Sequence, residues 1–417
     1  MTKFEKFQRF LITFLFVVAA FFGGWYFGKR GFIFEVRKNP PEIKILNQFP
    51  GDQTIDFDLF WQTWDLVASQ YLLRPVDGQK MLYGAIQGMV SSLGDPYTSF
   101  LPPAINETIT SALNGTYEGI GAELGIQEGQ LIVVAPLDGS PAKEAGVRSG
   151  DKIVKIEDEG TAGITINEAV AKIRGQAGTI ITLTLQRGNE EPFDVTIKRG
   201  NIVVASVTWA DKGDGVAYIR LSRFGADTNK EWSKVASEVS VGMQNLDAVV
   251  LDLRGNPGGF LQSAIFVAGE FFKNEVVVYQ ESATGEILAF DTTRIGVFEG
   301  VPTYVLIDEG SASASEILAA ALRSHSDAFL IGKKSFGKGT IQDARDFEDG
   351  SGIHLTVAKW LTPEKEWIHE VGLKPEVEVE RTSEEIEQGV DSQLNKALEL
   401  AKQGVIKAAD IPAQSSQ

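Results

Sequence analysis

Between residues 201 and 383, short apolar runs alternate with segments of helical period, and this alternation constrains the fold more than any other feature of the chain. The apolar runs have the length of buried strands and lie at residues 216–221, 248–253, 302–307 and 328–331. Helical patterns lie around residues 229–244, 260–272 and 314–325. Strands that alternate with helices form βαβ units, so this block is predicted to be an α/β domain with a mostly parallel sheet.

Residues 113–200 have a different pattern, in which glycine-rich turns separate short β-type runs. These runs lie at residues 131–134, 152–156, 180–186 and 193–198, with helical segments at 141–145 and 166–173. Short strands with two helices predict a compact α+β domain, so the chain as a whole is expected to be a multidomain protein of mixed α/β and α+β class.

Two further helical regions flank these domains. Residues 54–112 are predicted to form a small helical domain, because apolar residues recur there every three or four positions: Phe60, Trp64, Val67 and Tyr71. Asp95-Pro96 ends its second helix. Residues 384–402 are predicted to form an amphipathic helix, followed by a loose tail to residue 417, whereas residues 31–53 are expected to be a linker.

The first 30 residues carry an uncharged run from Phe10 to Gly28 between basic residues. At about 1.5 Å per residue the run nearly spans a hydrocarbon core of about 30 Å. An aromatic cluster at its end and the lack of a small-x-small cleavage site favour an uncleaved signal anchor. Basic residues flank the run on both sides, so the positive-inside rule gives little preference for either orientation. We expect the short tail to stay inside and the large domain to be exported.

Composition excludes several classes of function. The net charge of −17 argues against a nucleic-acid-binding protein, which needs a basic surface to neutralise phosphates. The chain contains no cysteine, which removes thiol nucleophiles and thiolate metal sites. Only three histidines are present, so no metal site and no cofactor are expected.

Ser313 lies where an apolar strand passes through the turn at Glu309-Gly310 into a helix. The free N–H groups and positive dipole end of a helix N-terminus favour negative charge that develops there, as in a catalytic site. The same residues also fit a capping box, in which Ser313 satisfies the N–H group of Glu316. On this segment alone both interpretations stay open.

The segment GKKSFGKGTIQ, residues 332–342, places Lys338 between two glycines. It nearly matches a phosphate-binding loop, but Gly339 replaces the Ser or Thr that would hold magnesium, and β-type residues follow instead of a helix. These departures argue against a nucleotide site. Lys338 is expected where the backbone passes close to another part of the protein.

The segment DLRGNPGG, residues 252–259, follows a predicted strand. Such a glycine-rich loop either turns a corner or exposes the backbone N–H groups of an oxyanion hole. By composition the two interpretations are equally supported.

Together these three segments resemble the carboxyl-terminal processing proteases, a family of serine peptidases with a Ser-Lys dyad and a PDZ domain. SASASEI (311–317) and FGKGT (336–340) are similar to the family's active-site signature, and DLRGNPGG to its oxyanion loop. GAIQGMVSSLGDPYTSFL (84–101) is similar to its helical-domain signature, apart from an extra glycine at Gly94. YEGIGAELG (117–125) and SPAKEAGVRSGD (140–151) are similar to the bacterial PDZ pattern. The resemblance covers roughly residues 56 to 400.

The resemblance implies a ClpP/crotonase-like protease core at 201–383 with a PDZ domain inserted before it at 113–200. It implies that Ser313 is the nucleophile, Lys338 the general base and Gln342 the partner of the lysine. The oxyanion hole would consist of the Ala314 N–H and that of one of two loop glycines, Gly258 or Gly259.

This chemistry requires a neutral amine at Lys338, although a free lysine has a pKa of about 10.4. Burial disfavours the charged form of lysine and lowers its pKa. We therefore expect Lys338 to be desolvated beside Ser313, with Gln342 orienting its nitrogen through a neutral hydrogen bond.

For the PDZ domain the resemblance implies a carboxylate-binding loop formed by Gly119, Ile120, Gly121 and Ala122. A substrate with an apolar C-terminus would add there as a strand. The expected partners are such protein substrates, the membrane, an adaptor protein and further copies of the chain, with the catalytic domain outside the cytoplasm. The alternative of another class is a catalytically silent PDZ scaffold or chaperone, which would have lost the dyad. His325, His354 and His369 are expected to be structural.

Overall fold

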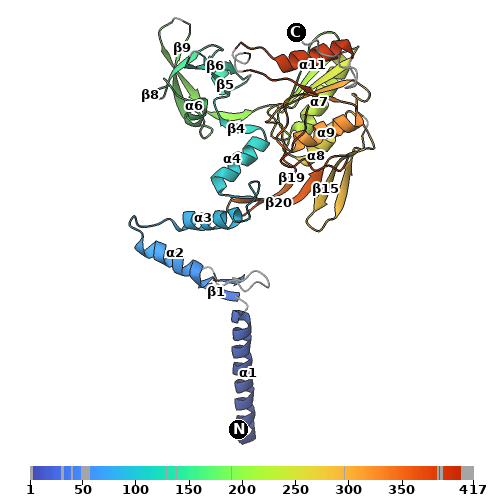
Figure 1. Ribbon diagram of the computed structural model, residues 1–417. Helices are drawn as coiled ribbons and strands as arrows, with labels where there is room; N and C mark the ends of the chain where they lie inside the picture. Colours follow the sequence, from blue (N-terminus) through green and yellow to red (C-terminus); the bar gives the residue numbers. More distant parts are fainter. Residues whose placement is uncertain are drawn as a thin grey trace. The chain divides into compact units, whose positions relative to one another are not determined.

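The computed structural model describes residues 3–29, 32–38, 41–47, 57–127, 129–137, 139–188, 190–294, 296–382, 385 and 388–404. By its contacts the chain divides into two compact units, Met1–Leu82 and Tyr83–Gln417. The second unit contains all the candidate site residues, and Figure 1 shows its helices and strands.

The first unit begins with the long helix α1 (Lys3–Lys29). Within it, residues Phe7–Tyr26 have a mean hydropathy of 1.7 and are long and apolar enough to cross a membrane. The strands β1 (Phe32–Lys38) and β2 (Pro41–Asn47) then pair as an antiparallel hairpin. The segment expected to be a linker, residues 31–53, thus contains a hairpin, whose β-branched and aromatic residues are typical of strands; residues 48–53 lie outside the described residues.

Helix α2 (Asp58–Gln70) has the apolar repeat expected from the sequence, and α3 (Gly78–Ser91) follows it. The second unit starts within α3, at Tyr83. Strand β3 (Ser99–Leu101) then pairs with β20 (Gly352–Leu361), and α4 (Pro103–Leu113) leads onward. The segment expected to complete a helical domain therefore contributes a strand to the second unit.

The main sheet of the second unit is mostly parallel, as predicted. Its order is β12-β13-β14-β17-β18-β21, and only the edge pair β12/β13 is antiparallel. The strands are β12 (Val207–Asp211), β13 (Val216–Leu221), β14 (Ala248–Asp252), β17 (Thr303–Ile307), β18 (Phe329–Gly332) and β21 (Val377–Glu378).

Both faces of this sheet are covered, which explains why its strands read as continuous apolar runs. Val249 and Leu251 pack with the helices α7 (Thr228–Gly242), α8 (Leu261–Ala268) and α9 (Ala314–His325) on one face. Their neighbours Ala248 and Val250 point to the other face and pack with Ala397 of the C-terminal helix. Successive side chains of a strand point to opposite faces, so each strand serves two cores.

A second, antiparallel sheet was not expected from the sequence. Its order is β16-β15-β20-β19, with β3 also paired to β20. The remaining strands are β15 (Val276–Ser282), β16 (Ile287–Asp291) and β19 (Thr340–Asp346). Because β19 follows Lys338 directly, this sheet sets the path of the chain after the candidate base.

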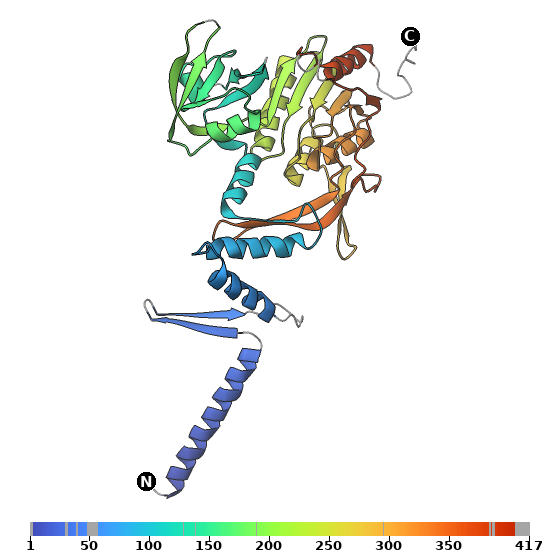
Figure 2. The same cartoon turned by 60° about the vertical axis from the view of Figure 1, so that its left-hand side comes forward.

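The α+β domain expected at 113–200 forms a separate lobe, drawn in teal and green in Figure 2. Its sheet has the order β10-β9-β7-β6-β5, with β8 (Glu159–Gly160) paired to β7. Its elements are β5 (Ala122–Gln127), β6 (Gln130–Pro136), α5 (Pro141–Glu144), β7 (Lys152–Ile156), α6 (Ile166–Ile173), β9 (Ile180–Gln186) and β10 (Phe193–Lys198). The antiparallel pair β4 (Thr116–Gly119) and β11 (Gly200–Val203) brings its two ends together.

The C-terminal helix α11 covers Ser392–Gln403, so the prediction of a helix from residue 384 was wrong at its start. Gly389 has φ 69°, a left-handed conformation that does not continue a helix. Asp391 is the N-cap residue and accepts a hydrogen bond from the Leu394 N–H at 3.0 Å.

Candidate active site

Ser313 lies at the N-cap of α9, directly after the loop that follows β17. Its backbone has φ 56° and ψ −115°, a conformation that is strained for any residue with a Cβ atom. Such a sharp turn from strand to helix presents a side chain above the end of the strand. Ser313 is partly exposed whereas Ala312 and Ala314 are buried, so the hydroxyl-bearing residue is the accessible one of the three.

The carboxylate of Glu316 connects the loop of Ser313 to the loop of Lys338. Its Oε2 accepts the backbone N–H of Ser313 at 2.8 Å and that of Lys338 at 2.9 Å. Its Oε1 accepts from the Gly337 N–H and the Ser335 hydroxyl, both at 2.6 Å. Glu316 is fully buried, so these four donors replace the water that a charged carboxylate would otherwise need. Ser313 and Glu316 also occupy capping-box positions, so the capping interpretation and a catalytic role of Ser313 are compatible.

Lys338 is half-buried, and its Nζ lies 5.2 Å from the centroid of the Tyr97 ring. Burial lowers the pKa of Lys338, while the negative charges of Asp95 and Glu316 oppose that shift. The direction is the one a general base requires. The close passage expected for the flanking glycines is present, because a Cβ atom on Gly339 would lie 2.7 Å from the Trp367 Nε1 atom.

Among the described residues, Gln342 forms no hydrogen bond with the Lys338 amine. Its Nε2 donates instead to the hydroxyls of Thr340 at 2.9 Å and Thr356 at 3.1 Å. Gln342 lies on β19 next to a register shift in the pairing with β20, and Thr356 is its partner residue on β20. The expected hydrogen bond from Gln342 to the lysine is therefore not formed in this structure.

The loop at residues 252–259 passes directly against Ser313. A Cβ atom on Gly258 would lie 2.9 Å from the Ser313 Cβ and 3.0 Å from the Ala314 nitrogen, so only glycine fits. The Gly258 N–H already donates to the Asn256 Oδ1 at 2.9 Å. The Gly259 N–H has no acceptor among the described residues, and Ala314 is the first helical residue, whose N–H has no partner within its helix.

Three residues near Lys338 were missed as site residues, although two of them lie in the segment GDPYTSF. Asp95 accepts hydrogen bonds from the Tyr97 N–H at 3.0 Å and the Thr98 hydroxyl at 2.6 Å, and its charge reaches Lys338. The Tyr97 ring contacts both Lys338 and, at 5.9 Å, the ring of His369. His369, which was expected to be structural, accepts from the Gly339 N–H at 3.3 Å. Spacing along the sequence gives no sign of these contacts, because residues 95–98 are far from Lys338 in the chain.

The predicted carboxylate-binding loop lies between β4 and β5. Gly119, Ile120 and Gly121 are buried and Ala122 is half-buried. The carbonyl groups of Ile120 and Gly121 accept from the N–H groups of Ala142 at 2.8 Å and Leu137 at 2.9 Å, which fixes the loop. Ile120 packs into the apolar core of the lobe, so its contribution to a binding site is its backbone.

The other two histidines form no hydrogen bond with Ser313 among the described residues. The His325 ring bonds to the Val276 carbonyl at 2.9 Å. Burial, and then the positive charge of Lys338, lower the pKa of His354. No group of three or more His, Cys, Asp or Glu side chains that could hold a metal ion occurs among the described residues.

A serine at the head of a buried helix, a half-buried lysine with a lowered pKa and a glycine loop beside them define a site of the serine-peptidase class. Comparison with known proteins agrees. The profile of peptidase family S41 matches residues 215–379, that of the PDZ domain residues 132–187, and that of the activating protease CtpB N-terminal domain residues 19–103.

Two relatives and one solved structure illustrate the similarity. The chain is 38% identical over 327 residues to the carboxy-terminal processing protease CtpA of Bacillus subtilis, covering 78% of this chain and 69% of that protein. It is 36% identical over 386 residues to the carboxyl-terminal-processing protease of Synechocystis sp., covering 89% of each. A putative S41 protease from Bacteroides fragilis shares the fold, with a TM-score of 0.58, 16% identity, and coverage of 86% of this chain and 100% of that one. The chain therefore belongs to the carboxyl-terminal processing proteases of peptidase family S41.

Proposed function

We propose that this protease cleaves peptide bonds through Ser313 as nucleophile and Lys338 as general base. One observation carries the proposal: the backbone N–H groups of both residues bind the same oxygen of buried Glu316, which holds the two loops at the head of α9. Burial lowers the pKa of Lys338, which favours the neutral amine that the reaction requires.

In the proposed reaction the neutral amine of Lys338 accepts the hydroxyl proton of Ser313 as its oxygen attacks the peptide carbonyl. The Ala314 N–H and the N–H of Gly258 or Gly259 stabilise the oxyanion that forms. Lys338 then gives the proton to the leaving amine, and water cleaves the acyl-enzyme. No metal ion or cofactor takes part.

Gln342 is proposed to orient the lysine, as the resemblance implies. It lies four residues after Lys338, on the strand that leaves the lysine loop. Its Nε2 donates to two neutral hydroxyls, and in the proposed arrangement its Oε1 accepts an N–H of the neutral Lys338 amine, whose lone pair is then directed at Ser313.

The family is named for its action at protein carboxyl termini, and the PDZ domain is the part of this chain suited to bind them. We propose that the loop of Gly119, Ile120, Gly121 and Ala122 presents backbone N–H groups to a terminal carboxylate, with an apolar last side chain beside it. Retention of Ser313, Lys338 and Gln342 disfavours the alternative of a silent PDZ scaffold or chaperone.

The domain layout and cellular placement are also proposals. α1 would be an uncleaved membrane anchor at residues 1–30, supported by its apolar span Phe7–Tyr26. A connecting segment at 31–53, a helical domain at 54–112, the PDZ domain at 113–200, a ClpP/crotonase-like core at 201–383 and a C-terminal segment at 384–417 would follow. The catalytic domain would lie outside the cytoplasm, where an adaptor protein or further copies of the chain would join it.

One experiment tests the catalytic assignment. The full chain in detergent is incubated with pairs of proteins that differ only in their last few residues, one member of each pair having an apolar end. Wild type should cleave the apolar-ended member preferentially, and Ser313→Ala and Lys338→Ala should cleave neither while keeping the wild-type circular dichroism spectrum. Full activity in either variant would refute the assignment.

A further inference from the structure

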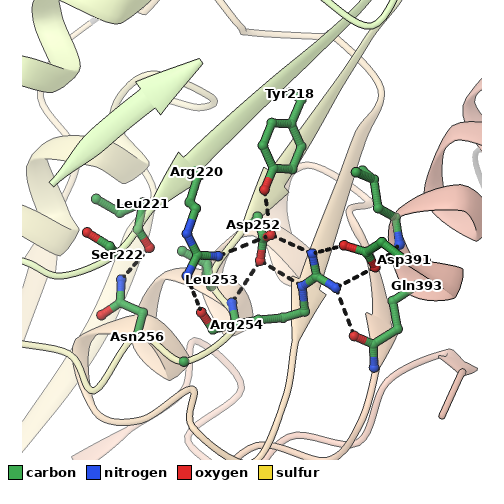
Figure 3. Close-up of polar contacts among 12 residues, drawn as sticks. Tyr218, Arg220, Leu221, Ser222, Asp252, Leu253, Arg254, Asn256, Asp391 and Gln393 are labelled. Carbon is green, nitrogen blue, oxygen red and sulfur yellow. Dashed lines mark hydrogen bonds and ion pairs between the residues drawn. The ribbon is translucent and has the colours of Figure 1, made fainter. Parts of the chain in front are cut away.

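A buried ionic network lies at the start of the glycine loop, where β14 ends (Figure 3). Asp252, the last residue of that strand, is fully buried. Its Oδ1 accepts from the Arg254 backbone N–H at 3.0 Å and from the Arg254 Nε at 2.9 Å, and its Oδ2 from the Arg254 Nη2 at 2.6 Å. Tyr218 and Arg220 reach the same carboxylate at 2.7 and 3.2 Å. Arg254 is therefore fixed from one side by the central sheet.

On its other side Arg254 binds the start of the C-terminal helix α11, as Figure 3 shows. Its Nη1 and Nη2 donate to the two carboxylate oxygens of Asp391 at 2.8 and 2.9 Å, and Nη1 also to the Gln393 Oε1 at 3.0 Å. Although burial raises the pKa of Asp391, the hydrogen bonds from Arg254 bring it below its ordinary value. Such a two-pronged pair fixes geometry as well as charge.

From Arg254 the chain runs directly into the loop that touches Ser313. The Gly255 N–H donates to the Asp308 Oδ1 at 2.8 Å, and the Asn256 side chain donates to the Leu221 carbonyl at 2.8 Å. The Asn256 carbonyl accepts from the Ala312 N–H at 3.0 Å. Gly255 and Asn256 are thus each held by a neighbouring loop or strand, and Arg254 binds residues of the C-terminal segment.

Within the network two arginines face two aspartates, and Arg381 adds a positive charge near Asp391. Arg254 is only 9% exposed, so a lost partner leaves a charge that water does not reach freely. Removing one member of a buried pair is costly for that reason. Arg254 would have to move to pair its charge again or to reach water. Such a movement would shift the loop of Gly258 and Gly259 relative to Ser313.

We propose that Arg254 is a positioning residue for the oxyanion hole and that Asp391 completes its setting, so that catalysis depends on the C-terminal helix. The inference rests on the proposed function, since it assumes that the loop at 252–259 stabilises the oxyanion. The helix lies beyond the residues matched by the S41 profile, which end at residue 379. In this proposal α11 acts on the active site through Asp391 and Arg254, and not by binding substrate.

Asp391→Asn in the full chain tests the proposal, because asparagine caps a helix as well as aspartate does but carries no charge. Arg254→Lys is the second variant, since lysine keeps the charge and loses the two-pronged geometry. Peptide hydrolysis is measured as kcat and KM separately, with thermal unfolding alongside. We expect kcat to fall at least tenfold in both variants with KM within about twofold, because one oxyanion donor is worth about 10²–10³ in kcat.

The matched control is Lys402→Ala on the same helix. Lys402 pairs with Asp214 at 2.8 Å, and both side chains are more than half exposed. This variant should keep the wild-type kcat. Asp391→Glu, which restores the charge, should recover more activity than Asp391→Asn.

The outcomes separate this inference from the proposed function. If Ser313→Ala is inactive while Asp391→Asn and Arg254→Lys keep the wild-type kcat, the positioning role is refuted and the catalytic assignment stands. A fall in kcat that only matches the unfolded fraction also refutes it, since that result indicates a structural role alone. If Ser313→Ala is active, the proposed function itself fails.

Discussion

Ser313 and Lys338 donate their backbone N–H groups to a single oxygen atom, the Oε2 of Glu316, at 2.8 and 2.9 Å. The two residues come from different loops, one entering α9 and the other leaving β18. Because both N–H groups bind the same buried carboxylate, the side chain of Glu316 helps to fix the position of Ser313 relative to Lys338. The catalytic pair that we propose is therefore assembled through Glu316 and not only through the sheet.

Replacing Glu316 with glutamine should damage both stability and activity. The glutamine amide has one acceptor oxygen, so at least two of the four donors around residue 316 lose their partner. Each unsatisfied buried donor costs about 1–3 kcal/mol. We expect the free energy of unfolding from urea titration to fall by about 2 kcal/mol or more. We also expect a lower kcat, measured at a temperature at which the variant is still folded.

The control for this change is Glu309→Gln. Glu309 pairs with Lys333 at 3.2 Å, but its side chain is 70% exposed. Exposed pairs contribute about 0–1 kcal/mol, so this variant should resemble wild type. Equal stability and kcat of Glu316→Gln and Glu309→Gln would contradict a linking role for Glu316.

Gly258→Ala should remove activity through a steric effect close to the nucleophile. The new methyl group would lie 2.7 Å from the Ala312 carbonyl oxygen and 2.9 Å from the Ser313 Cβ, at φ 97°. The loop must then move away from Ser313. Since the loop is proposed to stabilise the oxyanion, we expect kcat to fall by about 10²-fold or more in a peptide hydrolysis assay.

Gly255→Ala separates this steric effect from backbone strain. Gly255 also has a positive φ, 64°, but a Cβ atom there meets no heavy atom within 4 Å. Its variant should lose some stability and keep its kcat. If both alanine variants lose activity equally, strain in the loop and not contact with Ser313 is the cause.

Sequence reasoning proposed the candidate site from segments that resemble the family's motifs. SASASEI and the glycines around Lys338 indicated the two loops through that resemblance, and apolar runs located the strands of the parallel sheet. Glu316 was recognised only as a capping residue, because the contacts that make it central come from residues 335–338. A local pattern does not reveal an acceptor shared between distant loops.

The second sheet and the setting of Lys338 escaped prediction for a related reason. Strands β15 and β16 each contain four apolar residues in a row, at 276–279 and 287–290, but their sheet is completed by β20, a distant segment of mixed polarity. Tyr97 reaches Lys338 because β3 pairs with β20, a contact between residues about 250 positions apart. Pairing over such separations depends on the tertiary fold and not on local propensity.

Asp95→Asn should shift the pH dependence of hydrolysis toward lower pH. Burial lowers the pKa of Lys338, and the charge of Asp95 raises it again. Removing that charge lowers the pKa of Lys338 further, so the amine becomes neutral at a lower pH. Because only the neutral amine accepts the proton of Ser313, kcat/KM rises with pH through this pKa, and the rising limb should move to lower pH.

The measurement is kcat/KM across the pH range in which the protein stays folded. Asp343→Asn is the control, because Asp343 pairs with exposed Arg345 on β19 and does not affect the pKa of Lys338. Its rising limb should coincide with that of wild type. A shift of the Asp95→Asn limb to higher pH would show that hydrogen bonds of Asp95, and not its charge, control the lysine.

Gly121→Val should impair recognition of substrate C-termini while sparing the chemistry. A Cβ atom at Gly121 would lie 2.5 Å from the Ser140 Cβ and 2.9 Å from the Ile202 Cδ1, so the loop at 119–122 must change shape. Gly139 has a similar positive φ, 67° against 72°, but open space around it, and Gly139→Val therefore carries the same backbone strain without the clash. We expect the preference of Gly121→Val for an apolar C-terminus to fall roughly tenfold, about 1.4 kcal/mol of binding, with kcat on a short peptide unchanged. Gly139→Val should keep the preference. If both variants lose the preference, or if folded Gly121→Val keeps it, the loop at 119–122 does not bind the substrate end.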